Sequence, residues 1–225
     1  MHNSLIRACA LVLVAPAVTV TLSAALSEKL KGRIDESIVI LNELHAAPDK
    51  DIPLDLWDRA TCVIVIPSVK KAAFVFGGEY GKGLMSCRKG GAWSAPVFMQ
   101  LQKGSWGLQI GAQSIDLILL VNNDRGMKKL LGSKVTLGAE ASVAAGPVGR
   151  DARAATDAQM SAEILSYSRA QGLFAGINLS GGVLKPDGDD NKDLYGRKIT
   201  PAEVLTSDVA PPAAVAAFMK ALQRK

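Results

Sequence analysis

The chain has 225 residues, of which 48% are hydrophobic and 21% charged, so it can bury a substantial core within one domain. Nothing in this composition indicates a disordered or fibrous protein. The formal net charge of +5 is compatible with an anionic partner surface, but it falls short of the dense Lys/Arg stripe that is typical of nucleic-acid binding. We therefore expect a globular protein that does not bind nucleic acid.

The first 25 residues have the layout of a secretory signal peptide. Arg7 lies in a short polar start, an uncharged apolar run covers residues 8–20, and small residues follow up to Ala25. We expect cleavage after Ala24 or Ala25, export to the periplasm or out of the cell, and a mature domain of residues 26–225. The alternative is a retained membrane anchor, because the uncharged stretch is nearly long enough to span a bilayer.

Cleavage would leave two cysteines, Cys62 and Cys87, each in a strand-like run. In an oxidising compartment such a pair can form a disulfide, and the alternative is two buried free thiols. Two sulfur atoms and the single histidine of the mature chain, His45, are too few for a typical metal site.

The mature chain begins with an amphipathic helix at about residues 27–45. Its apolar side chains Leu30, Ile34 and Ile38 follow helical spacing, and Ser27 is suited to cap its first turn. A short second helix is predicted at residues 53–60, where a proline occupies the first turn.

Short β-rich runs separated by glycine, proline and asparagine turns follow the second helix. They cover residues 62–66, 72–76, 83–88, 93–101, 105–110, 115–121, 136–145, 163–168, 173–179 and 183–185. A helix at 124–131 interrupts them, and another ends the chain at about 212–223. The pattern predicts an α+β fold in which antiparallel, glycine-rich strands form a barrel-like or sandwich sheet with flanking helices at the N- and C-termini.

Two segments resemble catalytic or metal-binding motifs and fail the comparison. Residues 77–83 have the glycines of a P-loop but the wrong spacing, and they are interpreted as a glycine-rich bend between two strands. Residues 187–193 begin like a calcium loop, but Lys192 stands where the turn glycine belongs, so a solvated turn is expected. Asp116 lies in an apolar run and is expected to be a hydrogen-bonded structural carboxylate. No catalytic residues, cofactor or metal are predicted.

Several separated motifs occur together and in order, in residues 65–71, 77–83, 93–96, 107–113, 138–150, 167–169 and 172–176. With these motifs the chain resembles the SYLF domain family from about residue 30 to about residue 205. The resemblance implies a lipid-binding domain without enzymatic activity. Eukaryotic relatives bind phosphoinositides, and fungal relatives also bind and bundle actin. In the eukaryotic members an amphipathic helix that precedes the domain takes part in membrane binding, and residues 27–45 occupy that place here.

Our leading hypothesis is a peripheral association with anionic phospholipid surfaces. In it three apolar side chains of the first helix insert and six cations contact headgroups, namely Leu30, Ile34 and Ile38, and Lys29, Lys31, Arg33, Lys70, Lys71 and Lys82. Arg150 is a possible anion contact, and its alternative role is to tie down the preceding loop. Export would separate the protein from cytoplasmic actin, so actin is not expected as a partner.

Two rival hypotheses remain open. In one, the chain is a structural or protein-interaction domain of the cell envelope, and the first helix belongs to its core. In the other, it is an enzyme with a pocket that gathers Asp116, Glu140 or Arg150.

Overall fold

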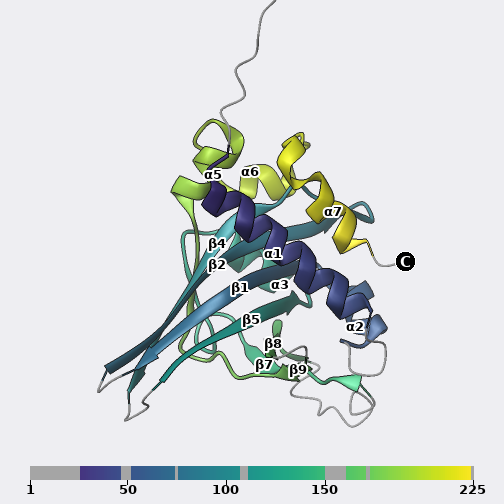
Figure 1. The fold of residues 1–225 in the computed structure, drawn as a ribbon. Coiled ribbons are helices and arrows are strands. Elements are labelled where there is room, and N and C mark those ends of the chain that lie inside the picture. The colour runs from purple at the N-terminus through teal and green to yellow at the C-terminus, as the bar shows by residue number, and fades with distance from the viewer. Residues whose placement is uncertain are drawn as a thin grey trace, which may run out of the picture.

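The computed structural model describes residues 26–46, 52–73, 76–106, 111–149, 161–170 and 173–223. Within them the chain forms one curled, half-barrel sheet with helices at both ends, so the predicted α+β fold with a barrel-like sheet is confirmed (Figure 1). The expected signal peptide, residues 1–25, and the candidate anion contact Arg150 lie outside the described residues.

The sheet contains ten strands in the order β6-β10-β4-β2-β1-β5-β8-β7, with β3 added to β2 and β9 added to β8. Every pairing is antiparallel except that of β7 with β8. The strands are β1 Cys62–Ala73, β2 Phe76–Lys89, β3 Ala92–Trp93, β4 Val97–Trp106, β5 Gly111–Val121, β6 Val135–Thr136, β7 Val143–Ala145, β8 Ile164–Ala170, β9 Leu173–Gly176 and β10 Val183–Pro186.

The N-terminal helix and the C-terminal helix contact each other on one face of the sheet (Figure 1). Ser27 caps the N-terminal helix as predicted, because its hydroxyl accepts a hydrogen bond of 3.3 Å from the Leu30 amide. None of the helices in the described part of the chain is long and apolar enough to cross a bilayer. The helices are α1 Glu28–His45, α2 Leu54–Arg59, α3 Asp124–Leu130, α5 Gly188–Tyr195, α6 Pro201–Thr206, the 3₁₀ turn η2 Ala213–Val215 and α7 Ala216–Leu222.

The part of the sheet around residues 62–66 is buried on both faces, which produces two apolar cores. Along β1, Val63 and Val65 face the core that contains α1 and α7, whereas Cys62, Ile64 and Ile66 face the opposite core. Successive side chains of a strand point to opposite faces, so a continuous apolar run such as 62–66 is what a doubly buried strand requires.

The Pro67-Ser68 pair does not end the first strand, contrary to the predicted break between residues 66 and 72. Instead, β1 continues through a β-bulge, in which residues 66–69 of β1 lie opposite only residues 81–83 of β2. The bulge pushes the β1 backbone against β2, where a Cβ on Gly83 would lie 1.9 Å from the Val65 carbonyl oxygen. The glycine-rich run is therefore part of a strand and not a bend, because glycine is needed for this close approach.

The predicted solvated turn at residues 187–193 is also corrected, because this segment forms helix α5. Asp187 caps it by accepting a 3.3 Å hydrogen bond from the Asp190 amide. Asp190 is buried, and the buried Asn191 side chain bonds both the amide and the carbonyl of Phe98, at 2.7 and 2.9 Å. Acidic residues near a helix N-terminus interact favourably with the helix dipole. An acidic run is therefore typical of the start of a helix as well as of a solvated turn.

A buried carboxylate, Glu163, joins α3 to the start of β8. Its two oxygens each lie 2.7 Å from the Lys129 ammonium, and one accepts a 2.8 Å hydrogen bond from the Ser142 amide. Burial alone would raise the pKa of Glu163, but the ammonium and the amide together hold it below its ordinary value of 4.5. The ionised form therefore stabilises the fold above that value, and the stabilisation is lost as the pH falls through the lowered pKa.

We expect Glu163→Gln to lower the free energy of unfolding by about 2 kcal/mol at pH 7, because Lys129 then keeps only a neutral partner. The difference from the wild type should shrink toward pH 3, where the wild-type carboxyl is also protonated. Urea unfolding followed by tryptophan fluorescence at the two pH values measures it. Asp35→Asn, an exposed position on α1, serves as the control and should change stability little at either pH. An equal loss for Glu163→Gln at both pH values would contradict this account.

Candidate anion-binding groove

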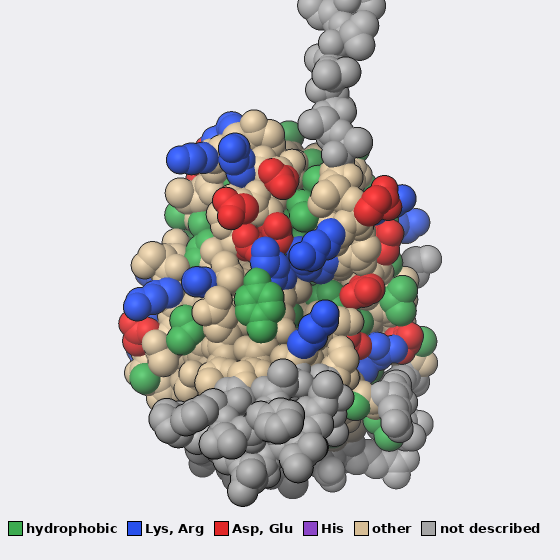
Figure 2. Space-filling model, turned by 60° about the vertical axis from the view of Figure 1, so that its left-hand side comes forward, with side chains coloured by type: hydrophobic (Ala, Val, Ile, Leu, Met, Phe, Trp, Pro, Cys, Tyr) green, Lys and Arg blue, Asp and Glu red, His purple; other side chains and the backbone are tan. Residues whose placement is uncertain are grey.

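A groove of about 410 Å³ lies between the first half of α1 and the bulged region of β1 and β2. Figure 2 shows a face of the molecule on which basic side chains surround one exposed hydrophobic side chain, with acidic side chains directly above them. The surface therefore carries mixed charge and is not a continuous basic patch. The groove is lined by Glu28, Lys29, Gly32, Arg33, Glu36, Pro67, Ser68, Lys70, Tyr80, Gly81 and Lys82.

Four of the six predicted headgroup cations come together in this groove. Lys29 and Arg33 are four residues apart on α1 and therefore share one side of the helix. Lys70 pairs with Tyr80 across β1 and β2, and Lys82, two residues further along β2, points to the same face as Tyr80. The β-bulge and the helix position thus unite residues that are 53 positions apart in the sequence.

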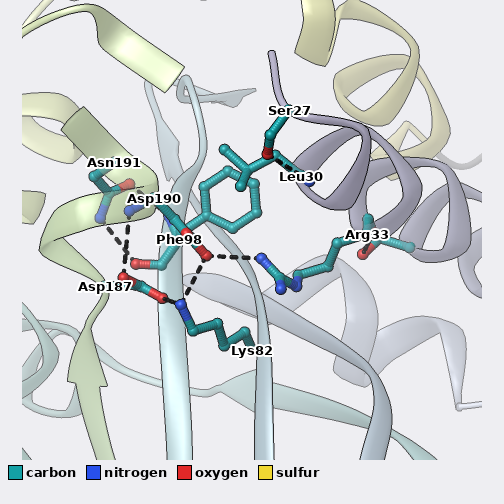
Figure 3. A network of polar contacts seen from close by, with 9 residues as sticks. Ser27, Leu30, Arg33, Lys82, Phe98, Asp187, Asp190 and Asn191 are labelled. Atoms are coloured by element: carbon teal, nitrogen blue, oxygen red, sulfur yellow. Dashed lines mark hydrogen bonds and ion pairs between the residues drawn. The ribbon is translucent and has the colours of Figure 1, made fainter. Parts of the chain in front are cut away.

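Two of these cations are already paired with acidic side chains of the α5 segment (Figure 3). One Asp190 oxygen lies 2.7 Å from the Arg33 guanidinium and 3.1 Å from the Lys82 ammonium, and Lys82 also forms an ion pair with Asp187. The guanidinium of Arg33 additionally lies 5.7 Å from the centre of the Phe98 ring. Two cations and two carboxylates balance formally in this cluster, which we call the inner end of the groove because Arg33 and Lys82 line the groove there.

The environment shifts the three titrating groups of the cluster in different directions. Burial would lower the pKa of Lys82, but its bonds to Asp187 and Asp190 raise it above the ordinary value of 10.5. Burial would raise the pKa of Asp187, which the Lys82 ammonium and the helix amide nevertheless hold below its ordinary value. The pKa of Asp190 is raised, mainly by burial and also by repulsion from Asp187, against the opposing effect of Lys82.

The outer end of the groove, formed by Lys29, Lys70 and Tyr80, differs from the inner end because its cations are exposed and unpaired among the described residues. Lys29 and Lys70 are exposed, and no carboxylate of the described residues lies within ion-pair distance of either. Tyr80 is 44% exposed beside them, which makes it one of the few large hydrophobic side chains on the described surface. Tyr80 was not among the predicted site residues, although its position two residues before Lys82 in a strand indicates that both side chains share a face.

The three apolar side chains that were expected to insert into a membrane do not lie at the surface. Leu30 and Ile34 are only 3% and 2% exposed, because they pack into the core beneath α1. Ile38 is half-buried and faces a second hollow between α1 and α7. In this structure α1 therefore presents its polar face to solvent, and its apolar stripe holds it on the sheet.

The remaining predicted cations contribute less to the groove. Lys31 is exposed on α1 but does not line the groove. Lys71 lies in β1, and its side chain is outside the described part of the structure, as is Arg150.

The two carboxylates named by the enzyme hypothesis each have hydrogen-bond partners. Asp116 accepts a 2.9 Å hydrogen bond from the Ser68 amide in the bulge and forms a 2.5 Å ion pair with Arg169, which also bonds Glu43 of α1. This matches the structural role expected for Asp116. Glu140 accepts a 2.6 Å hydrogen bond from the amide of Thr136, the last residue of β6. In the described ranges, no three His, Cys, Asp or Glu side chains are grouped as metal ligands.

The expected disulfide is present. Cys62 of β1 lies directly opposite Cys87 of β2, and the two sulfur atoms are bonded. Both residues are fully buried in the core opposite α1. The bond therefore ties together two neighbouring central strands at the end of the sheet where β1 begins.

Comparison with known proteins identifies the family. The family model described as Ysc84, a Las17-binding protein actin regulator, matches residues 102–225. An SH3 domain-containing protein of Schizosaccharomyces pombe is 40% identical over 167 residues, covering 72% of this chain and 39% of that protein. LAS seventeen-binding protein 3 of Saccharomyces cerevisiae is 32% identical over 201 residues, covering 88% and 43%.

The human SH3 domain-containing YSC84-like protein 1 is 31% identical over 191 residues, which cover 82% of this chain and 56% of that protein. The chain thus spans between 39% and 56% of the length of these curated relatives. The matched family model, the extent of these similarities and the motifs of the sequence agree. The chain belongs to the Ysc84 family, which is the SYLF domain family that its sequence resembles.

Proposed function

We propose that this chain is a non-catalytic binding domain that associates peripherally with anionic membrane surfaces through the outer end of the groove. Lys29 and Lys70 contact lipid phosphates, and the ring of Tyr80 lies at the level of the headgroups. The observation that carries the proposal is that two exposed cations, neither of which has a carboxylate partner among the described residues, flank an exposed aromatic ring in one hollow. Association is reversible and involves no chemical step.

Insertion of the first helix is not part of this proposal. Leu30 and Ile34 would have to leave the core, and exposing two such side chains costs roughly 2 kcal/mol each before any membrane contact forms. Lys29, Lys70 and Tyr80 need no such rearrangement. Binding through them is therefore electrostatic and shallow, and it should weaken as the salt concentration rises.

We expect the double variant Lys29→Ala/Lys70→Ala to bind vesicles with 30% phosphatidylglycerol about 10- to 30-fold more weakly than the wild type at low salt, since each cation near an anionic surface contributes about 1 kcal/mol. Co-sedimentation at a series of lipid concentrations, with phosphatidylcholine vesicles as the neutral reference, measures the change.

The matched control is Lys128→Ala/Lys134→Ala, which removes the same charge from exposed positions on and after α3. Its vesicle affinity should fall no more than about three-fold, because it lowers the net charge of the protein without changing the groove. Equal losses for both double variants would show that net charge alone drives binding. Negligible pelleting of the wild type with both kinds of vesicle would overturn the proposed function.

We further propose that the protein is exported. The layout of the first 25 residues supports this, and a buried disulfide is typical of oxidising compartments. The intact mass of the protein purified from cells that express the full chain tests it. A mature form that begins near Ala25 or Leu26 is expected, whereas a full-length form in the membrane fraction would favour the retained anchor.

A second candidate function is a protein-interaction domain, and the observation that favours it is the burial of the apolar face of α1. The family description adds weight, since it names a Las17-binding actin regulator. Co-sedimentation with actin filaments distinguishes the two candidates. Pelleting with filaments but with neither kind of vesicle would replace the membrane proposal with this one.

A further inference from the structure

The inner end of the groove contains a ready-made anion site that the protein itself already fills. Arg33 and Lys82 converge from α1 and β2 on one place, and the carboxylates of Asp187 and Asp190 occupy it (Figure 3). One Asp190 oxygen bridges the two cations, and a phosphate oxygen can make the same two charge-assisted contacts. The arrangement has the donors of an anion site with an internal anion in place.

These two carboxylates are held firmly in position. Asp187 is fixed as the N-cap of α5, and α5 is anchored to β4 by the two hydrogen bonds between Asn191 and the Phe98 backbone. The side chains of Asp190 and Arg33 are each only 12% exposed, so their attraction is weakly screened by solvent. An incoming anion must therefore compete with a rigid and largely desolvated pair.

Other charges facing the groove do not share this arrangement. From α1 these are Glu28, Lys29 and Glu36, and from β1 the side chain is Lys70. Glu36 lies 3.4 Å from the Ser68 hydroxyl, and no ion pair joins Glu28 to a cation of the described groove. Among the described residues, the carboxylates that form ion pairs with Arg33 and Lys82 thus belong to the α5 segment.

We propose that Asp187 and Asp190 act as an internal counter-anion, which keeps Arg33 and Lys82 from anionic ligands and so sets the affinity of the groove. This inference rests on the proposed membrane-binding function. Of the four described cations that line the groove, Lys29 and Lys70 are then the ones available to an anionic surface in the wild type, and the groove discriminates against weakly charged surfaces. Neutralising the internal anion adds two cations to the site.

We expect Asp190→Asn to bind vesicles with 30% phosphatidylglycerol about five-fold more tightly than the wild type, because it frees Arg33 while Lys82 keeps Asp187, and one cation made available near an anionic surface strengthens binding about five-fold. Affinity is measured by co-sedimentation. Circular dichroism and urea unfolding establish that the variant is folded. Asp187→Asn is a second, milder variant, since asparagine caps a helix as well as aspartate. Its affinity for the same vesicles should rise about three-fold.

Glu28→Gln is the matched control, because it removes the same charge from the same groove without touching Arg33 or Lys82. Its affinity for the same vesicles should rise about two-fold. If Asp190→Asn and Asp187→Asn gain no more than Glu28→Gln, while the wild type still binds through Lys29 and Lys70, the internal counter-anion is overturned and the proposed function stands. If neither the wild type nor any variant pellets with anionic vesicles, both the function and this inference are overturned.

Discussion

Replacing Gly83 with alanine should destabilise the domain by more than about 3 kcal/mol, enough to prevent stable folding in a protein of ordinary stability. The added Cβ would lie 1.9 Å from the Val65 carbonyl oxygen and 2.6 Å from the Ile66 Cα atom. Both are backbone atoms of a central strand, so they cannot move aside as a flexible side chain could. Relief requires β1 and β2 to separate at the bulge.

The substitution should also disturb the groove, because the bulge positions the groove residues of β1 and β2. Lys70 follows it directly on β1, and Gly83 neighbours Lys82 on β2. Urea or thermal unfolding of Gly83→Ala measures the effect. Gly78→Ala is the matched control on the same strand, since a Cβ there would make only an ordinary 3.7 Å contact with the Lys103 carbonyl. A Gly83→Ala protein as stable as Gly78→Ala would show that the two strands do not approach as described.

Loss of the Cys62–Cys87 disulfide should lower the free energy of unfolding by about 3–4 kcal/mol. The bond closes a loop between residues that are 25 positions apart, and this constrains the unfolded chain much more than the folded sheet. For a domain of this length such a loss corresponds to a fall in melting temperature of about 6–15 °C. The comparison is between oxidised and fully reduced protein in urea unfolding.

A double serine variant, Cys62→Ser/Cys87→Ser, checks the same prediction without a reductant. Its loss should be somewhat larger, because both sulfur positions are fully buried and each hydroxyl then lies in an apolar core. Under native conditions the bond should resist mild reductants, since solvent does not reach it. Free thiols at Cys62 and Cys87 in the purified protein, together with unchanged unfolding on reduction, would contradict the bond.

Local sequence patterns determined most of the elements. The apolar spacing and the Ser27 cap located α1 to within one residue of its observed start, and the pair of cysteines indicated the disulfide. The two clearest errors, at Pro67-Ser68 and at residues 187–193, occurred where a turn signal was overruled by its surroundings. In the bulge, Asp116 accepts the hydrogen bond of the Ser68 amide, so the chain can continue as a strand. In the acidic run, the helix dipole and Lys82 stabilise the negative charges, so the segment can form a helix.

The candidate site was only partly predictable, because its members come from distant segments. Listing cations found Lys29, Arg33, Lys70 and Lys82, and the fold brings these four around one groove. Spacing along the chain could not reveal that two of them are neutralised by Asp187 and Asp190, since the pairs join residues 157 and 105 positions apart. An ion pair of this kind depends on the relative placement of α1, β2 and α5.

The sequence by itself therefore determined the class of fold, the family and the apolar face of the first helix, all of which depend on local periodicity and short motifs. Only the tertiary structure decided where that apolar face points. Leu30 and Ile34 are buried because the sheet beneath α1 offers an apolar surface that water does not, and the membrane contact that we propose therefore uses exposed cations and not these side chains. Whether a charged side chain is available to a ligand is likewise a property of its neighbours in space, and these are fixed by the fold.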